Sequence, residues 1–173
     1  QAILTIKEGV VTDFTTKKVN TKTTGTVVTF TPDPKGFHLE PIKVDFNELK
    51  EMCETWAYLS PGLVFELENF DTEEKVKYDF KNGIVDLIKA KNKKPLHSQV
   101  ISKKVEDENG NKVEVAIQWS RERQENAFVF TNGLHNSQGG TSLTGARTSL
   151  TRTMNNLADI KFSGESIRTG LYY

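Results

Sequence analysis

Few residues of this sequence have the types and spacing that catalysis requires. The three histidines do not have metal-ligand spacing: His38, His97 and His135. Gly140 and Gly145 are spaced like the glycines of a phosphate-binding loop, but Ala146-Arg147 stands where a lysine and a hydroxyl residue would hold phosphate and magnesium. There is no Gly-x-Ser-x-Gly nucleophile motif. The residues alone therefore predict no metal site and no complete active site.

The most informative local feature is the run Gly139-Gly140-Thr141. Two glycines permit positive φ angles, and Thr141 can cap the helix that we expect to follow. A helix N-terminus carries partial positive charge and unpaired amides, which favour an anion such as a DNA phosphate. The alternative is an ordinary tight turn into a capped helix, and both interpretations remain open here. Arg147 and Arg152 lie five residues apart, so we expect them on different sides of that helix, with one of them structural or solvated.

The composition excludes several classes of protein. The chain has 173 residues, of which 36% are hydrophobic and 27% charged, too apolar for a disordered chain and too polar for a membrane protein. The 23 basic and 23 acidic residues balance, so net charge gives no argument for nucleic acid. One cysteine, Cys53, excludes a disulfide scaffold within the chain, and its spacing places it on the buried side of a helix. We expect a cytoplasmic protein without a membrane segment.

The first part of the chain alternates strands and helices. Ile3–Ile6, Val10–Phe14 and Thr26–Phe30 are rich in β-branched residues and predict strands. Pro32–Gly36 predicts a turn or a linker. A helix should begin after Asp45 and run past Ala57, with a strand over Leu63–Leu67 that pairs with Val76–Tyr78 and a short helix over Ile84–Ile88. The polar, basic stretch Lys89–Pro95 then predicts a domain boundary, as a solvated linker or alternatively as a patch that faces phosphate.

The sequence from Val100 onward predicts a second group of strands with a helix. Val100–Val105 and Val113–Trp119 should form a hairpin across Asn109-Gly110, followed by a strand over Ala127–Thr131. A helix is expected from about Ser142 to Ala158, and the terminal Leu171–Tyr173 predicts a further strand. That aromatic end, with the absence of an initial Met, leads us to expect a segment of a longer protein.

Several collinear stretches resemble the B subunit of DNA gyrase and of bacterial topoisomerase IV. Asn126–Asn132 leads into Gly139-Gly140-Thr141, Gly145 and Leu150-Thr151-Arg152-Thr153-Met154-Asn155 in the order of that family's signature. Further similar stretches cover almost the whole chain: Lys22–Asp33, Pro95-Leu96-His97, Val113–Trp119 and Ser163–Leu171. The sequence is therefore similar to a type IIA topoisomerase.

The resemblance implies an α+β fold of two-layer sandwiches. Residues 1–92 would be the C-terminal part of a GHKL-type ATPase domain, and residues 93–173 an incomplete transducer domain that resembles domain 2 of ribosomal protein S5. The parent enzyme would pass one DNA duplex through another, with ATP and Mg²⁺ as cofactors. Its partners would be DNA, a topoisomerase A subunit or fused A region, and a second B subunit in a homodimeric gate.

The same resemblance assigns few site residues to this chain. Thr26 corresponds to the threonine that supports the family's adenine-binding carboxylate. Gly139, Gly140, Thr141, Arg147 and Arg152 correspond to a loop and helix that face DNA or hold the loop. The family's catalytic Glu, glycine-rich lid and switch Lys have no counterpart between residues 1 and 173, so this chain alone is expected to be inactive and to bind no cofactor. Ser137 stands where some members carry an Arg or His that faces DNA, and Gly133 stands where an Asn is usual. Because a neutral serine cannot release a counterion from DNA, this loop would contribute less to DNA binding.

Two alternatives differ in class. One is a related GHKL machine, such as a MutL-like repair ATPase or an Hsp90-like chaperone, against which the Gly139–Thr141 run argues. The other is a non-catalytic binding module with an S5-like fold, which charge neutrality favours. DNA affinity that falls steeply with salt would distinguish a DNA-facing role from such a module.

Overall fold

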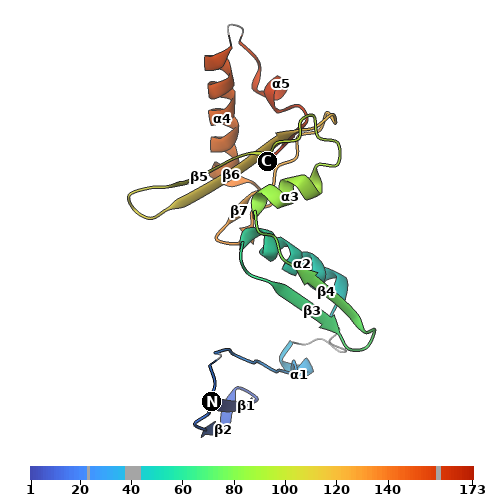
Figure 1. Cartoon of the computed structure of the whole chain (residues 1–173), viewed down its shortest axis with the longest axis vertical. Coiled ribbons are helices and arrows are strands. Elements are labelled where there is room, and N and C mark those ends of the chain that lie inside the picture. The colour runs from blue at the N-terminus through green and yellow to red at the C-terminus, as the bar shows by residue number, and fades with distance from the viewer. Residues whose placement is uncertain (23, 38–43, 159–160) are drawn as a thin grey trace. The chain divides into compact units, whose positions relative to one another are not determined.

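The first unit of the chain, Gln1–Asp45, is built on one β-hairpin (Figure 1). The computed structural model describes residues 1–22, 24–37, 44–158 and 161–173, so His38 lies outside the described residues. Strands β1 (Ala2–Lys7) and β2 (Val10–Thr16), both predicted from their β-branched residues, pair antiparallel. Glu8 and Gly9 both have positive φ, 52° and 77°, which matches the twist of a two-residue hairpin turn.

Two predictions for this unit are wrong. Helix α1 (Pro34–Phe37) occupies the expected turn. The predicted strand over Thr26–Phe30 is not formed, and Val27 is 93% exposed. A strand needs a neighbour for its backbone N–H and C=O groups, and none of the described strands pairs with this segment.

The second unit, Phe46–Tyr173, begins with a helix packed on a hairpin. Helix α2 (Phe46–Leu59) precedes β3 (Phe65–Asn69), which pairs antiparallel with β4 (Glu74–Tyr78). Cys53 is buried on α2, and the ring of Tyr58 stacks on Phe80 with 3.7 Å between centroids. The helix, the hairpin and the burial of Cys53 were all predicted, because apolar residues recur every three to four positions along the helix and differently along the strands.

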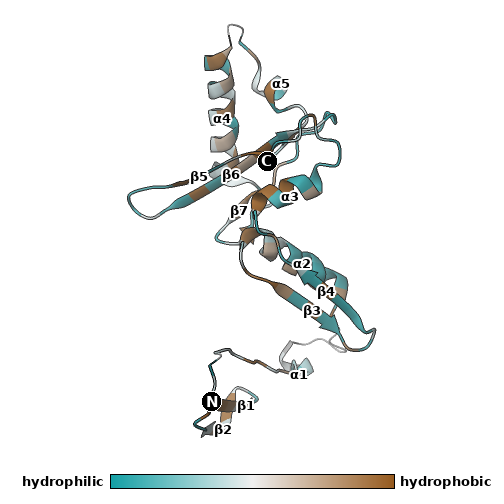
Figure 2. Cartoon of the chain, in the orientation of Figure 1, coloured by the Kyte–Doolittle hydropathy of each residue, from teal (hydrophilic) through white to brown (hydrophobic). Residues whose placement is uncertain are grey.

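The core of this unit forms between a helix and a three-stranded sheet. Helix α3 (Ile84–Lys91) packs on a sheet of order β5-β6-β9, made of Ile101–Glu106, Lys112–Trp119 and Leu171–Tyr172. The buried cluster joins Ile88 of α3 to Val100, Ala116 and Tyr172. Hydrophobic colouring lies on α3 and along part of β6 (Figure 2). The sheet face toward α3 carries Ala116, while Val115 and Ile117, which alternate with it along β6, lie on the opposite face.

The stretch Lys89–Pro95 is largely exposed, as one interpretation of its composition expected, but its first residues belong to a helix rather than to a linker. Helix α3 continues to Lys91, and Asn92 is buried directly after it. The Asn92 Nδ2 donates to Gln118 Oε1 at 2.9 Å, and Gln118 Nε2 donates to the carbonyl oxygen of His97 at 2.9 Å. These hydrogen bonds tie the end of α3 to β6. The division into domains at residue 92 stays a prediction, while the compact unit spans both sides of it.

Two helices and a short hairpin complete the unit. The predicted strand over Ala127–Thr131 is shorter than expected: only β7 (Phe130–Thr131) pairs, with β8 (Leu134–His135). Helix α4 (Gly140–Leu157) begins two residues before the predicted start, and α5 (Gly164–Arg168) follows it. The Asn155 side chain accepts from Phe162 N at 2.7 Å and donates to Phe162 O at 3.0 Å, which brings the chain back along α4.

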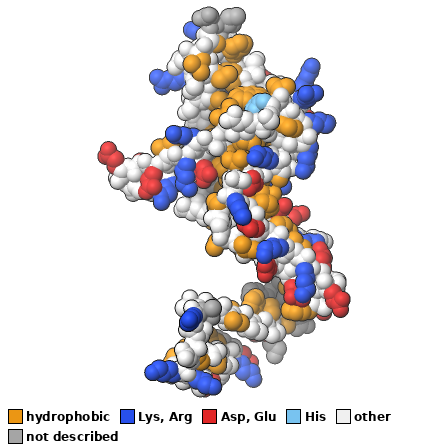
Figure 3. All heavy atoms as spheres, in the orientation of Figure 1, with side chains coloured by type: hydrophobic (Ala, Val, Ile, Leu, Met, Phe, Trp, Pro, Cys, Tyr) orange, Lys and Arg blue, Asp and Glu red, His pale blue; other side chains and the backbone are white. Residues whose placement is uncertain are grey.

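Charged side chains of both signs lie over the β5–β6 hairpin (Figure 3). Two ion pairs cross it, Lys104 with Glu114 and Lys112 with Glu106. Over the described part of the chain, no helix has the length and apolar character needed to cross a bilayer.

Candidate functional site

Gly139 and Gly140 form a turn in which both residues have a left-handed backbone. Their φ angles are 69° and 57°, as their positions in the predicted turn require. A Cβ at Gly139 would lie 2.3 Å from Leu143 Cδ2, and one at Gly140 would lie 3.1 Å from Asn136 Nδ2. The glycine pair therefore lets the chain turn tightly against the first turn of α4.

The predicted cap is wrong. The N-cap residue of α4 is Gly139, which makes no side-chain cap hydrogen bond, and Thr141 lies inside the helix as its second residue. The amides of Gly139 and Gly140 donate to Asn136 O at 2.9 Å and Gln138 O at 2.8 Å. Because the turn already uses these two amides, they are not available to a phosphate.

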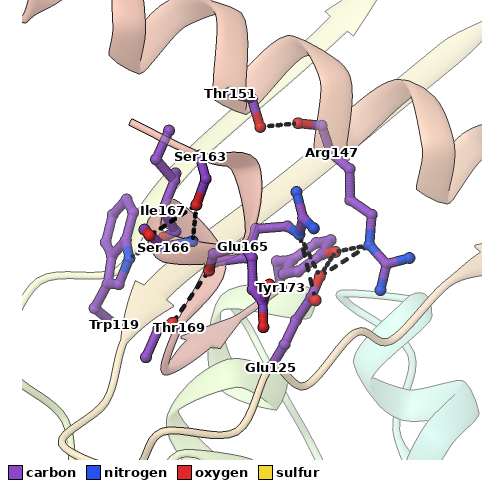
Figure 4. A network of polar contacts seen from close by, with 11 residues as sticks. Trp119, Glu125, Arg147, Thr151, Ser163, Glu165, Ser166, Ile167, Thr169 and Tyr173 are labelled. Atoms are coloured by element: carbon purple, nitrogen blue, oxygen red, sulfur yellow. Dashed lines mark hydrogen bonds and ion pairs between the residues drawn. The ribbon is translucent and has the colours of Figure 1, made fainter. Parts of the chain in front are cut away.

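Arg147 lies in a network of polar contacts around Glu125 (Figure 4). Its Nε donates to Glu125 Oε1 at 2.9 Å and to the Tyr173 hydroxyl at 3.2 Å. The Tyr173 hydroxyl donates to Glu125 Oε1 at 2.5 Å. Arg168 of α5 is the fourth member, with its Nε 3.2 Å from Glu125 Oε1. One carboxylate thus joins α4, α5 and the end of the chain beyond β9.

The network keeps Glu125 ionised and Tyr173 protonated. Burial by itself would raise the pKa of Glu125, but the hydrogen bonds from Tyr173 and Arg147 outweigh it and lower that pKa below its ordinary value. Burial, then the hydrogen bond to Glu125, raise the pKa of Tyr173 to about 12. The same partners raise the pKa of Arg147 further, so its charge is fixed.

A hollow of about 420 Å³ lies beside this network, between α4 and α5. It is lined by three arginines, two threonines and a glycine: Arg147, Thr148, Thr151, Arg152, Gly164 and Arg168. Arg147 and Arg152 were expected to project from different sides of the helix. Both residues line the hollow, but in different roles: Arg147 is paired with Glu125, whereas Arg152 is exposed.

Glu125, Arg168 and Gly164 are site residues that sequence reasoning missed. Arg168 and Gly164 lie within a stretch that resembled the gyrase B pattern, but no spacing singled them out. Glu125 is separated by 22 residues from Arg147 and by 43 from Arg168, so no local motif could join them. Their encounter depends on the tertiary packing of α4 and α5.

The remaining predicted residue, Thr26, is exposed in the irregular segment of the first unit. A role in nucleotide binding stays a prediction, because the described residues place no carboxylate on it. Within the described residues, no group of three or more His, Cys, Asp or Glu side chains could hold a metal ion.

The sequence matches the family model for DNA gyrase B over residues 83–173, more than half of the chain. The chain belongs to the DNA gyrase B family. That match includes the whole of α4 and α5, and it decides against the MutL-like and Hsp90-like alternatives. The match does not test the other alternative, a non-catalytic binding module, because that alternative differs in activity rather than in family.

Curated relatives agree with the gyrase B assignment. The chain is 36% identical over 162 residues to the B subunit of the type 2 topoisomerase of Aquifex aeolicus, covering 87% of this chain and 20% of that protein. It is 30% identical over 158 residues to the B subunit of DNA gyrase of Clostridium acetobutylicum, covering 85% of this chain and 24% of that protein. The chain thus spans about a fifth to a quarter of these relatives' length.

Solved structures share the fold. The B subunit of DNA gyrase from Myxococcus xanthus superposes with a TM-score of 0.78 at 19% identity, covering 98% of this chain and 51% of that one. The 43K ATPase domain of Thermus thermophilus gyrase B, in complex with an aminocoumarin, gives 0.70 at 22% identity, covering 82% and 41%. The fold is accordingly the mixed α+β fold of gyrase B ATPase-domain structures.

Proposed function

We propose that this chain is part of the ATP-operated gate subunit of a type II DNA topoisomerase and relays the nucleotide state to DNA strand passage. The observation that carries the proposal is the Glu125 network, within the region that matches gyrase B. It connects α4, α5 and the residue after β9 through one charged group, so a displacement of one element changes the others.

The domain assignment is part of the proposal. Residues 1–92 would belong to the GHKL-type ATPase domain and residues 93–173 to the S5-like transducer. The α4–α5 hollow supports a transducer that faces DNA, because Arg147, Arg152 and Arg168 outnumber the acidic Glu125 among the described residues around it. Supercoiling or decatenation would be the activity of the complete enzyme.

ATP and Mg²⁺ belong to the complete enzyme in this proposal. The described residues do not fit either group on their own: Thr26 offers one exposed hydroxyl, and no carboxylate cluster accompanies it. We therefore derive no step through the nucleotide or the metal. The partners proposed for the complete enzyme are DNA, an A subunit or fused A region, and a second B subunit.

The test is ATP-dependent relaxation or supercoiling of plasmid DNA by the complete protein with its A subunit. We expect a change in linking number that requires ATP, and we expect Glu125→Ala to uncouple ATP turnover from it. The matched control is Glu108→Ala, which removes an exposed carboxylate from the β5–β6 turn. A complete protein that changes no linking number with ATP, yet pairs with a protein partner independently of salt, would overturn the proposal in favour of the binding module.

A further inference from the structure

Both arginines of the Glu125 network contact its carboxylate through their Nε atoms. Arg147 and Arg168 each approach the carboxylate through Nε, at 2.9 and 3.2 Å. A guanidinium has five N–H donors, and the four on its terminal nitrogens lie on the side away from the side chain's stem. Among the described residues, no hydrogen bond occupies the terminal nitrogens of either arginine.

We propose that Glu125 is a positioning residue that holds Arg147 and Arg168 side-on, so that their terminal nitrogens, with Arg152, bind one phosphate oxyanion in the α4–α5 hollow. The inference rests on the proposed function and deepens it, because it names the ligand chemistry and the residue that arranges it. The oxyanion could come from the backbone of DNA or from free phosphate.

The close approach of Gly164 supports this arrangement. A Cβ at Gly164 would lie 2.7 Å from Arg168 Nη1 and 3.1 Å from Thr151 Oγ1. Gly164 itself lines the hollow, so a terminal nitrogen of Arg168 reaches the wall of the hollow where a side chain is missing. Thr151 Oγ1 donates to Arg147 O at 2.8 Å, which fixes the wall opposite.

The charges favour an oxyanion over other ligands. Three guanidinium groups and one carboxylate leave an excess of positive charge among the described residues of this site. Arg152 is exposed and pairs with no described carboxylate, so it is free to follow a ligand. Planar N–H donors match the tetrahedral oxygens of phosphate, and such charge-assisted hydrogen bonds are among the stronger ones.

The test measures two probes on the full 173-residue chain: a short fluorescent duplex DNA by anisotropy, and inorganic phosphate by NMR shifts of residues 147–152 and 164–168. We expect Arg152→Gln to weaken binding about ten-fold and to reduce the salt slope for DNA by about one. The matched control is Arg121→Gln, an exposed arginine after β6 that does not line the hollow.

Glu125→Gln separates positioning from charge. The substitution adds one positive charge to the site, so simple electrostatics predicts tighter binding of an anion. A positioning role predicts weaker binding by several-fold, because both arginines lose the group that orients them. Tighter binding by Glu125→Gln would therefore overturn the proposal.

Gly164→Ala provides a second variant that keeps the charge constant. The new methyl displaces a terminal nitrogen of Arg168 without removing a charge, so we expect weaker binding of phosphate. Gly145→Ala on α4 is its matched control, since a Cβ there meets nothing within 4 Å. Equal affinities for wild type and Gly164→Ala would contradict the subsite.

The two probes distinguish the source of the oxyanion. Binding of DNA with no response to free phosphate assigns the subsite to the DNA backbone, and a response to phosphate alone assigns it to a free anion. Binding of neither probe overturns the proposal. If strand passage by the complete protein nevertheless persists, the proposed function stands without this subsite.

Discussion

Asn92 is a single buried side chain that joins two elements. It donates to Gln118 Oε1 at 2.9 Å, and both side chains are almost fully buried. A buried amide oxygen that loses its donor keeps the whole cost of its lost hydration. Removal of the Asn92 donor should therefore cost more free energy than an intact hydrogen bond contributes to stability.

Asn92→Ala should lower the free energy of unfolding by about 1 to 3 kcal/mol, because Gln118 Oε1 loses this donor within a dry core. Urea denaturation followed by tryptophan fluorescence measures the change. Asn109→Ala in the exposed β5–β6 turn is the control, with an expected effect within about 0.5 kcal/mol. An equal decrease in the free energy of unfolding in the two variants would show that the buried Asn92–Gln118 hydrogen bond stabilises the fold no more than an exposed side chain does.

Tyr58 gives the unit Phe46–Tyr173 an alkaline limit. Burial, with the charges of Glu54 and Asp86, raises the pKa of Tyr58 to about 12 from an ordinary value of 10.0. A folded pKa above the unfolded one stabilises the fold fully below pH 10.0, and this contribution is lost as the pH rises toward 12. The neutral phenol is thus the form that the fold retains.

Tyr58→Phe should make the alkaline loss of stability less steep between pH 10.0 and about 12, because the ring still stacks on Phe80 while the ionising group is gone. Thermal melts across that range check the slope. A variant that loses stability as steeply as the wild type would rule out Tyr58 as a cause.

At the scale of elements, α4 depends on the turn before it more than on a side-chain cap. Gly139 has φ 69° and lies against Leu143, so the first turn of α4 closes directly onto a glycine. A side chain at this position would meet both the left-handed backbone and Leu143. The start of the helix is therefore fixed by the absence of a side chain.

Gly139→Ala should destabilise the fold by more than about 1 kcal/mol, the cost of a strained backbone conformation, with the clash at Leu143 added. Gly145→Ala, in the middle of the same helix, should stabilise it by roughly 0.5 to 1 kcal/mol. Circular dichroism melts of the pair measure both. The idea fails if the two variants shift stability in the same direction.

Most elements could be predicted from local patterns, and the site could not. The alternation in β5 and β6, the Asn109-Gly110 turn and the apolar period of α4 each act over a few residues, so the sequence specifies them. The segment Thr26–Phe30 has the composition of a strand, but pairing decides whether one forms. Glu125 and Arg168 meet only through tertiary packing, which no period in the sequence records.

At the scale of the whole molecule, the core places α3 and the β5-β6-β9 sheet in one cooperative body. Ile88 is 2% exposed, and its cluster includes Ala116 and Tyr172 from two strands of the sheet. The helix α2 and hairpin β3–β4 precede α3 in the same unit. We therefore expect the unit Phe46–Tyr173 to unfold in one step, across the predicted boundary at residue 92.

The two tryptophans report on this cooperativity, because Trp56 lies on α2 and Trp119 on β6. In single-tryptophan variants, Trp56→Phe and Trp119→Phe, both probes should show one denaturation midpoint. Ile88→Ala should lower the midpoint reported by both probes, because it should reduce the free energy of unfolding by about 2 to 5 kcal/mol. Separate midpoints would instead support two domains that meet near residue 92.

The contacts of Glu125 also follow an order along the chain, at separations of 22 residues to Arg147, 43 to Arg168 and 48 to Tyr173. A ribosome releases the chain from its N-terminus, so Glu125 leaves the exit tunnel first, followed in turn by Arg147, Arg168 and Tyr173. Nascent α4 therefore leaves the tunnel before the Glu125 network can be completed. A pause in translation after α4 would prolong the interval in which Glu125 has Arg147 as a partner but neither Arg168 nor Tyr173.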